Sequence, residues 1–287
     1  MGHPRLSYLF ERELFPISKG PQEYSGENRM NLTRRGFLKL SGGAFLLFNW
    51  IGKGRAEDSR KIPVLLYHDI SETFKDEYTV SPGQFAAQME WLYEEGYQTL
   101  FFSEIDSLKR EEFEKIILIT FDDGYASFLD YAFPLLQAYQ FKATVNVIGR
   151  EVGTFISLGG NRPTLSWDEY RYLLKSGLVD LGCHTYHLHL KGGVLSVSED
   201  RLREDLERFQ EEAQKEIGRR LDILSWPFGL FDERRIRIAK DLGFRYFLTS
   251  IEGFFRKGSG IEAIPRLNIN NRLDLLSFRR YLEEETL

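Results

Sequence analysis

The residues best suited to chemistry are two adjacent carboxylates, Asp122 and Asp123, which follow the apolar run 115–121 and precede Gly124. A short, continuous apolar run rich in β-branched residues predicts a fully buried strand of a parallel sheet. In α/β folds, ligands and catalytic groups gather at the carboxyl ends of such strands, because the loops there converge on one crevice. The two carboxylates are therefore candidates for catalysis or ligand binding, although Asp-Asp-Gly is also a common turn sequence.

A second candidate set consists of three histidines within six residues, His184, His187 and His189, out of five in the whole chain. Neighbouring imidazoles repel one another when protonated and need partners when buried, and a metal ion satisfies both requirements. His184 and His189 would point to opposite faces of a regular strand, so they could share one ion only if a bend follows the strand. His187 and His189 would share a strand face. Solvent-exposed or purely structural histidines are the alternative.

These two sets together have the composition of a catalytic metal site. Two or three nitrogen ligands and one carboxylate, with a position open for water, are typical of catalytic zinc. Asp122 and Asp123 are the nearest obvious source of the carboxylate. Because adjacent carboxylates cannot easily do the same job, we expect one to bind the ion and the other to act as a general base toward water at the metal.

The composition of the chain is that of an ordinary globular protein, with 287 residues, 42% hydrophobic and 28% charged. Residues 1–56 carry nine Lys or Arg and four Asp or Glu, a balance of +5, so the remainder of this chain of net charge −5 carries −10. An acidic body argues against nucleic acid or an anionic membrane as the main partner. The one cysteine, Cys183, excludes an intramolecular disulfide and a Cys-x-x-Cys metal site.

We expect three regions along the chain. Residues 1–29 have no clear apolar periodicity and are interpreted as an upstream extension, with translation starting at Met30. Residues 30–56 are interpreted as an export signal, and residues 57–287 as one folded domain.

The export signal resembles those of the twin-arginine route. Arg34 and Arg35 precede an uncharged stretch, residues 40–52, and a small-residue cleavage site that ends near Ala56. The apolar core is shorter than the roughly 20 residues of a membrane-spanning helix, so we expect no stable membrane anchor after cleavage. The expected location is the periplasm or the extracellular space. A buried helix that begins with Arg-Arg by chance is the alternative.

Beyond residue 60, strand patterns alternate with helix patterns. Strands are expected at residues 62–67, 97–102, 115–121, 142–148, 178–183, 223–226, 246–249 and 263–269. Helices are expected at residues 81–92, 128–139, 166–177, 196–218 and 273–281, with capping boxes at Ser81 and Ser166. This alternation with short connections predicts an α/β domain of parallel strands with crossover helices. A (β/α) barrel and a wound open sheet both satisfy the pattern.

The chain resembles the polysaccharide deacetylases, the NodB-homology or carbohydrate esterase family 4 proteins. The strongest matches are Thr-Phe-Asp-Asp-Gly-Tyr at 120–125 and His-Thr-Tyr-His-Leu-His at 184–189, which occur in the family's order and separation. Weaker matches lie at 64–69, 165–167 and 225–229. The resemblance covers residues 61–270 and implies a single domain folded as a deformed (β/α)7 barrel.

The resemblance also implies roles for individual residues. Asp123, His184 and His189 would bind one divalent metal ion, with zinc ahead of other transition metals, and Asp122 would be the base. The backbone N–H of Tyr125 would stabilise the oxyanion that forms when water attacks the carbonyl carbon of an N-acetyl group.

The five-residue step from His184 to His189 is similar to that of the branch acting on poly-β-1,6-N-acetylglucosamine. In that arrangement His187 is a bystander.

The sequence departs from the family pattern at two functional positions. No arginine precedes the Pro-Phe-Gly segment, and Arg266 is the expected substitute, paired with Asp122 and keeping it ionised, with an ordinary surface ion pair as the alternative. The family's late histidine, a general acid, is missing because no histidine follows His189. His68, at the end of the first strand, and protonated Asp122 are candidates for that role. Trp226, beside the Pro-Phe-Gly segment, is a candidate for substrate contact.

The leading hypothesis is an exported, metal-dependent N-deacetylase whose partner is a polysaccharide that contains N-acetylglucosamine. One alternative is a carbohydrate-binding protein without turnover on the same barrel, which the missing histidine and the supply of fourteen tyrosines and four tryptophans favour. Another is a deacetylase that acts on peptidoglycan or a different amide.

Overall fold

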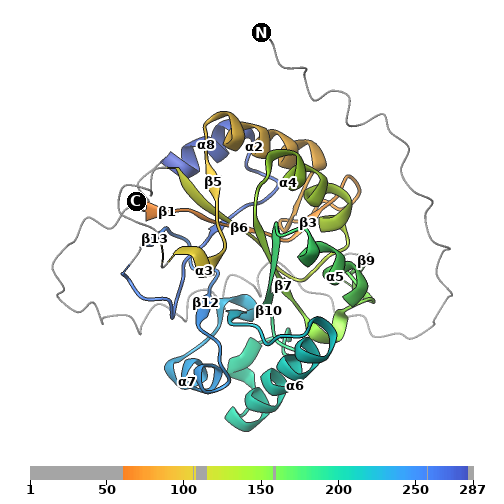
Figure 1. The fold of residues 1–287 in the computed structure, drawn as a ribbon, viewed down its shortest axis with the longest axis vertical. Coiled ribbons are helices and arrows are strands. Elements are labelled where there is room, and N and C mark those ends of the chain that lie inside the picture. Colours follow the sequence, from red (N-terminus) through yellow and green to blue (C-terminus); the bar gives the residue numbers. More distant parts are fainter. Residues whose placement is uncertain (1–60, 106, 108–114, 158–159, 257, 284–287) are drawn as a thin grey trace. The chain divides into compact units, whose positions relative to one another are not determined.

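The structure, a computed structural model, describes residues 61–105, 107, 115–157, 160–256 and 258–283 (Figure 1). All of them belong to one compact unit that spans residues 56–287. The upstream extension and the export signal expected from the sequence lie outside the described residues. Within the described ranges, no helix combines the length and the apolar character needed to cross a membrane.

A sheet of parallel strands forms the centre of the domain. Among the described residues, seven strands follow one another in the order β12-β11-β10-β7-β6-β2-β14, and every pairing along this path is parallel. Their bounds are β2 Val64–Tyr67, β6 Ile116–Phe121, β7 Ala143–Val147, β10 Val179–Cys183, β11 Ile223–Ser225, β12 Tyr246–Leu248 and β14 Leu267–Asn268. A further short strand, β5 (Gln98–Thr99), pairs with β6.

The segment that carries β14 closes the sheet into a barrel. Ile264 pairs with Leu248 of β12, whereas Leu267 pairs with Leu65 of β2. The strand expected at residues 263–269 is therefore divided between two neighbours, because one short segment has to span the gap between the edges of the sheet. The resulting ring of seven strands confirms the expected deformed (β/α)7 barrel and excludes the wound open sheet.

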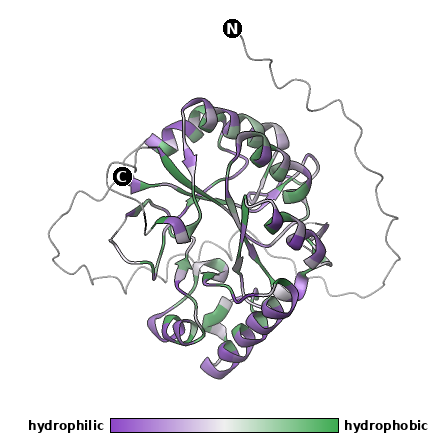
Figure 2. Ribbon diagram, in the orientation of Figure 1, coloured by the Kyte–Doolittle hydropathy of each residue, from purple (hydrophilic) through white to green (hydrophobic). Residues whose placement is uncertain are grey.

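Most helices cover the outer face of the sheet, whereas a short one, residues 102–105, packs with Leu118 and Ile223 in the smaller apolar cluster (Figure 1). Their bounds are α2 Pro82–Glu94, α3 Phe102–Ile105, a π-helical turn Phe128–Ala132 that continues into α4 Phe133–Tyr139, α5 Trp167–Lys175, α6 Glu199–Ile217, α7 Glu233–Asp241 and α8 Leu275–Glu283. The capping boxes expected at Ser81 and Ser166 are present at the N-termini of α2 and α5. In α6, Leu202, Leu206 and Phe209 are buried, and its outer side is hydrophilic (Figure 2).

Among the residues that the structure describes, three pairs of short strands lie outside the central sheet. They are β1 Lys61–Ile62 with β13 Phe255–Arg256, β3 Asp69–Ile70 with β4 Thr79–Val80, and β8 Phe155–Ser157 with β9 Asn161–Pro163. The strand expected at residues 97–102 is shorter than its pattern predicts. The Glu104 carboxylate accepts a hydrogen bond from Phe101 N–H at 2.8 Å and thereby favours the start of α3 at residue 102.

The two faces of the central strands have different partners. One face packs against the helices and contributes side chains such as Leu65, Ile119 and Val145 to the larger core. The other face lines the barrel, where Leu118 and Ile223 belong to a smaller apolar cluster. Because side chains alternate along a strand, the residues two positions further along these strands also line the barrel. They are the polar Thr120 and Ser225, so the barrel interior changes from apolar to polar toward the carboxyl ends of its strands.

Candidate active site

The two adjacent carboxylates follow β6 at the carboxyl end of the barrel. Asp122 and Asp123 are 3% and 7% exposed. Asp123 and Gly124 have left-handed φ values of 73° and 76°, which Asp tolerates better than most residues and Gly adopts freely. A Cβ at Gly124 would overlap the Tyr170 hydroxyl. The Asp-Asp-Gly sequence is therefore a tight turn, and it also holds two buried carboxyl groups at the end of a strand.

The histidine segment follows β10 and bends immediately after it. Thr185 has a left-handed φ of 68°, which ends the extended strand. The bend brings the rings of His184 and His189 to a centroid separation of 5.0 Å, although a regular strand would place them on opposite faces.

Asp205 of α6 holds the backbone of this bend. The Asp205 carboxylate accepts hydrogen bonds from Tyr186 N–H at 2.7 Å and from His187 N–H at 2.8 Å. Asp205 is 2% exposed, and both amides lie between the two histidines that converge. A helix therefore fixes the loop that positions them.

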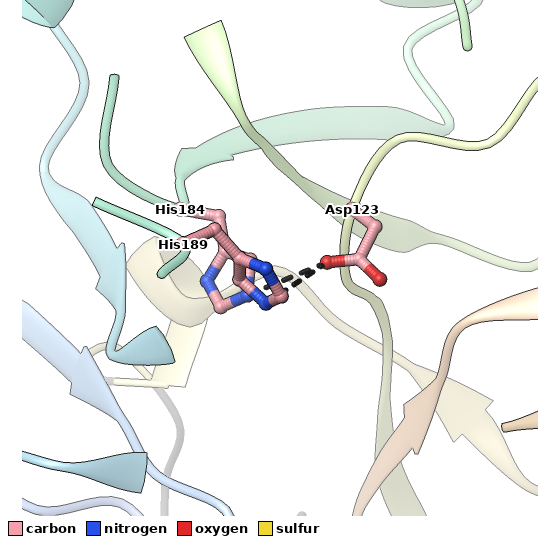
Figure 3. A group of neighbouring side chains, drawn as sticks. All are labelled: Asp123, His184 and His189. Carbon is pink, nitrogen blue, oxygen red and sulfur yellow. Dashed lines mark ion pairs between the residues drawn. The ribbon is translucent and has the colours of Figure 1, made fainter. Parts of the chain in front are cut away.

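One oxygen of Asp123 faces both imidazole rings, as the dashed lines in Figure 3 show. Asp123 Oδ1 lies 3.5 Å from His184 Nε2 and 3.7 Å from His189 Nε2, and the three ligand atoms lie within 4.8 Å of one another. Ligand atoms about 2.1 Å from a tetrahedral zinc ion are about 3.4 Å apart. The two distances from Asp123 Oδ1 are therefore compatible with the binding of one ion by all three residues.

Two further features fit a metal at this point. Asp123 Oδ1 is buried and has no hydrogen-bond partner, which is costly unless a cation neutralises it. His184 Nδ1–H donates to the carbonyl oxygen of Ser225 at 2.8 Å, so the Nε2 lone pair faces Asp123. Burial lowers the pKa of His184, and this effect outweighs the nearby Asp122 carboxylate that raises it, so the ring is neutral as a ligand must be.

Asp122 has a very different environment from Asp123. Arg266 donates from Nη1 to Asp122 Oδ1 at 2.9 Å and from Nη2 to Oδ2 at 2.7 Å. Asn146 Nδ2 donates to Oδ1 at 2.7 Å, and the Ser225 hydroxyl donates to Oδ2 at 3.0 Å. Asp122 Oδ2 is also 4.0 Å from His184 Nε2, which places it beside the candidate metal ligands.

The ion pair expected between Arg266 and Asp122 is thus present, and it is buried rather than on the surface. Arg266 is 1% exposed, and its Nε donates to the Thr249 carbonyl at 2.7 Å. Burial raises the pKa of Asp122, but the positive charge of Arg266 and its hydrogen bonds, with a contribution from His184, lower it by more. The pKa of Asp122 is therefore held well below its ordinary value of 3.8, and the group is ionised at neutral pH.

The other candidates lie at different depths around this centre. His68 follows β2, is partly exposed, and is close enough to lower the pKa of Asp122. Its ring packs edge-on against Tyr78 at 5.1 Å. The side chain of Tyr125 is buried, and its backbone N–H has no acceptor among the described residues.

The burial of Trp226 does not suit the role of a sugar-stacking residue. It is 1% exposed and stacks between Phe231 and Phe247, with centroid separations of 6.0 and 5.9 Å, because it faces the core between sheet and helices. Phe228, which follows in the same segment, is 45% exposed and lies 4.6 Å from the His189 ring. It adopts a left-handed φ of 59°, a strained conformation for an aromatic residue.

His187 is not part of the group of candidate ligands among the described residues. It contacts the Arg150 guanidinium instead. This position agrees with the expectation that His187 is a bystander.

Sequence reasoning missed three residues that organise the site, namely Asn146, Asp205 and Ser225. Asn146 interrupts the apolar pattern of β7, and Asp205 lies on the buried face of α6 beside Leu206. A polar residue within an apolar pattern is a usable signal, because such a residue needs a hydrogen-bond partner. The pattern does not identify the partner.

Comparison with known proteins matches the central part of the chain to one family model. Residues 109–247 match the family model for polysaccharide deacetylase. The chain carries a polysaccharide deacetylase domain.

Three relatives are similar to this chain over most of its length. YxkH of Bacillus subtilis (strain 168), named as a polysaccharide deacetylase, is 28% identical over 82% of this chain and 79% of its own. The poly-β-1,6-N-acetyl-D-glucosamine N-deacetylase of Escherichia coli (strain K12) is 26% identical over 75% of this chain but only 38% of its own length. The protein of the same name in Staphylococcus aureus (strain MSSA476) is 27% identical over 68% of this chain and 69% of its own.

Solved structures support the same fold. A polysaccharide deacetylase from Bacillus cereus superposes with a TM-score of 0.67 at 26% identity, covering 78% of this chain and 69% of that one. IcaB from Ammonifex degensii superposes with a TM-score of 0.69 at 23% identity, covering 78% of this chain and 97% of that one. The expected polysaccharide deacetylase domain and the expected barrel are both confirmed.

Proposed function

We propose that this polysaccharide deacetylase is a metal-dependent hydrolase that removes N-acetyl groups from N-acetylglucosamine residues of an extracellular or cell-wall polysaccharide. The observation that carries the proposal is the convergence of Asp123, His184 and His189 around an unpartnered carboxylate oxygen, with the ionised Asp122 alongside. Two of the relatives are named as deacetylases of poly-β-1,6-N-acetyl-D-glucosamine, which supports this substrate class.

In this proposal Asp123, His184 and His189 hold one divalent ion, and two nitrogens with one carboxylate oxygen favour zinc. When bound, the ion supplies Lewis acidity toward the acetamide carbonyl and the attacking water. The hydrogen bond from His184 to the Ser225 carbonyl orients that ring for its role.

The reaction requires one proton to leave the attacking water and one to reach the departing amine. Asp122 is proposed as the base, because it is ionised and because its Oδ2 lies beside His184. The unpartnered N–H of Tyr125 is proposed to donate to the oxyanion as the carbonyl carbon becomes tetrahedral. When the C–N bond breaks, the amine takes its proton from protonated Asp122 or from His68, acetate leaves, and a free amine remains on the sugar.

We also propose that the protein is exported by the twin-arginine route to the periplasm or the extracellular space. The support is the sequence of residues 30–56, with Arg34 and Arg35 before an uncharged stretch. This route carries folded proteins, which suits a domain that acquires its metal before export.

The function is tested by the release of acetate from β-1,6-linked N-acetylglucosamine oligomers in the presence of zinc. The wild type should release acetate, and Asp122→Asn should lower kcat by about 100-fold or more while the bound zinc stays unchanged. Asp123→Asn should instead lose zinc affinity, because it removes the charged ligand.

Three outcomes would redirect the assignment. Equal rates for the wild type and Asp122→Asn would contradict the role of the base. Binding of oligomers without acetate release, with or without zinc, would favour the carbohydrate-binding alternative. Acetate release from peptidoglycan fragments but not from the oligomers would move the same chemistry to another substrate.

A further inference from the structure

Asn146 is a fully buried polar side chain in a strand whose other four residues are also buried. Its Nδ2 donates to Asp122 Oδ1 at 2.7 Å, whereas its own Oδ1 has no hydrogen-bond partner. A buried amide oxygen without a hydrogen-bond partner destabilises the fold, so an apolar residue at this position would give a higher free energy of unfolding. The side chain is therefore better explained by its contact with Asp122 than by packing.

Gly182 of β10 provides the space for this amide. Gly182 is the register partner of Asn146 in the neighbouring strand. A Cβ at Gly182 would overlap Asn146 Oδ1 and would lie 2.9 Å from Cγ2 of Ile223. The amide oxygen thus occupies a gap that only glycine leaves, and the amide nitrogen faces the carboxylate.

The carboxylate of Asp122 accepts two hydrogen bonds on each oxygen. Oδ1 accepts from Asn146 and from Arg266 Nη1, and Oδ2 accepts from Ser225 Oγ and from Arg266 Nη2. A carboxylate has about four lone-pair sites, so all of them are occupied. A proton can bind to Asp122 only where one of these donors withdraws.

Ser225 is the donor that can withdraw. Its Oγ already accepts a hydrogen bond from Arg266 Nη2 at 2.9 Å, so the oxygen stays anchored when the hydroxyl hydrogen rotates away from Asp122. The Asn146 amide cannot withdraw its hydrogen in this way, because its N–H is fixed in the plane of the group and its oxygen occupies the space left by Gly182.

We propose that Asn146 is a positioning residue that keeps Oδ1 of Asp122 occupied and so directs proton transfer to Oδ2, with the Ser225 hydroxyl turning aside to admit the proton. Oδ2 is the oxygen that lies 4.0 Å from His184 Nε2, on the side of the candidate metal ligands. In the step, the O–H bond of the attacking water breaks and an O–H bond to Asp122 Oδ2 forms. The proposal rests on the proposed role of Asp122 as base.

The test compares Asn146→Leu with Thr144→Val in the zinc-loaded protein. Thr144 lies on the same strand and the same face, is equally buried, and makes no hydrogen bond to Asp122. Asn146→Leu should lower kcat for acetate release by about 10- to 100-fold with KM and bound zinc unchanged. Its Tm should stay within about 4 °C of the wild type. Thr144→Val should leave kcat within about twofold of the wild type.

Two further variants complete the test. Asn146→Val, which matches the strand neighbours Val145 and Val147, replaces Asn146→Leu if that protein does not fold, with the same expected kcat. Gly182→Ala should lower kcat as well, because the added methyl group would overlap Asn146 Oδ1 and displace the amide.

The proposal is overturned if the Asn146 variants keep kcat within about twofold of the wild type, or if their loss of kcat matches an equal loss of zinc or of folded protein. A wild type that releases no acetate would instead remove the proposed function on which the inference rests. These results are distinguishable, because the first two occur in a series with an active wild type.

Discussion

At the scale of single residues, the site gives two neighbouring carboxyl groups very different environments. Asp122 accepts four hydrogen bonds and pairs with Arg266, whereas Asp123 Oδ1 has no partner and faces two imidazoles. The sequence predicts both carboxylates and the division of labour between them, because adjacent acids at a strand end cannot serve one function. It does not predict the donors Asn146 and Ser225, because these come from β7 and β11, and the sequence does not show which strands lie beside β6 in the sheet.

The Arg266 ion pair should dominate the effect of pH on the stability of the metal-free domain. Arg266→Gln leaves Asp122 buried without its cation, and we expect a loss of about 3–5 kcal/mol in the free energy of unfolding at neutral pH. The folded pKa of Asp122 is lowered from 3.8. The unfolded chain therefore binds more protons than the native state below that pH, and the contribution of the pair is lost as the pH falls through this range.

Denaturant unfolding between pH 3 and pH 7 measures this effect. The difference between the wild type and Arg266→Gln should be largest at pH 7 and should shrink as the pH falls, because burial without Arg266 raises the pKa of Asp122 in the variant, whereas Arg266 lowers it in the wild type. The control is Arg237→Gln, which removes an exposed pair with Glu233 and should cost no more than about 0.5 kcal/mol. A pH-independent difference for Arg266→Gln would contradict the lowered pKa of Asp122.

At the scale of elements, most of the framework follows from local signals. The capping boxes at Ser81 and Ser166 predict the starts of α2 and α5, and the apolar run at residues 115–121 predicts β6. Two features do not follow from local signals. The bend after His184 depends on the contact with Asp205 of α6, and the division of residues 263–269 depends on both edges of the sheet.

The bend predicts a role for α6 in metal binding. In Asp205→Asn, the amide presents an N–H₂ group to one of the two backbone N–H donors, Tyr186 or His187, so one of the two hydrogen bonds is lost. We expect zinc affinity to fall by about 10- to 100-fold, as for other residues that orient metal ligands. Isothermal titration with zinc measures the change.

Glu204→Gln is the matched control for this effect. Glu204 precedes Asp205 on α6, but its side chain is 67% exposed and pairs with Arg201. Its zinc affinity should equal that of the wild type. Unchanged affinity in Asp205→Asn would show that the bend holds without α6.

At the scale of the whole molecule, the alternation of strands and helices predicts parallel strands but does not distinguish a barrel from an open sheet. The barrel depends on one segment that joins the two edges of the sheet, because Ile264 pairs with β12 and Leu267 pairs with β2. The family resemblance predicts the barrel correctly, because a family motif is associated with one known fold, whereas hydrophobic periodicity indicates only individual helices and strands. The net negative charge of the residues after 56 is compatible with a neutral polysaccharide as ligand.

Export should depend on a part of the chain that is separate from the deacetylase domain. Replacing Arg34 and Arg35 with lysines should prevent export through the twin-arginine route, because that route depends on the arginine pair. Cell fractionation measures the location. The retained protein should still release acetate, since the residues of the proposed site all lie beyond residue 60, and unchanged export would refute the proposed route.

The central claim is that Asp123, His184 and His189 share one divalent ion. Anomalous scattering from a crystal of the zinc-loaded protein, recorded on both sides of the zinc absorption edge, tests it most directly. A single peak should lie about 2.0–2.2 Å from an Asp123 oxygen and from Nε2 of both histidines. A peak at other residues, or no peak at this centre in fully loaded protein, would contradict the account.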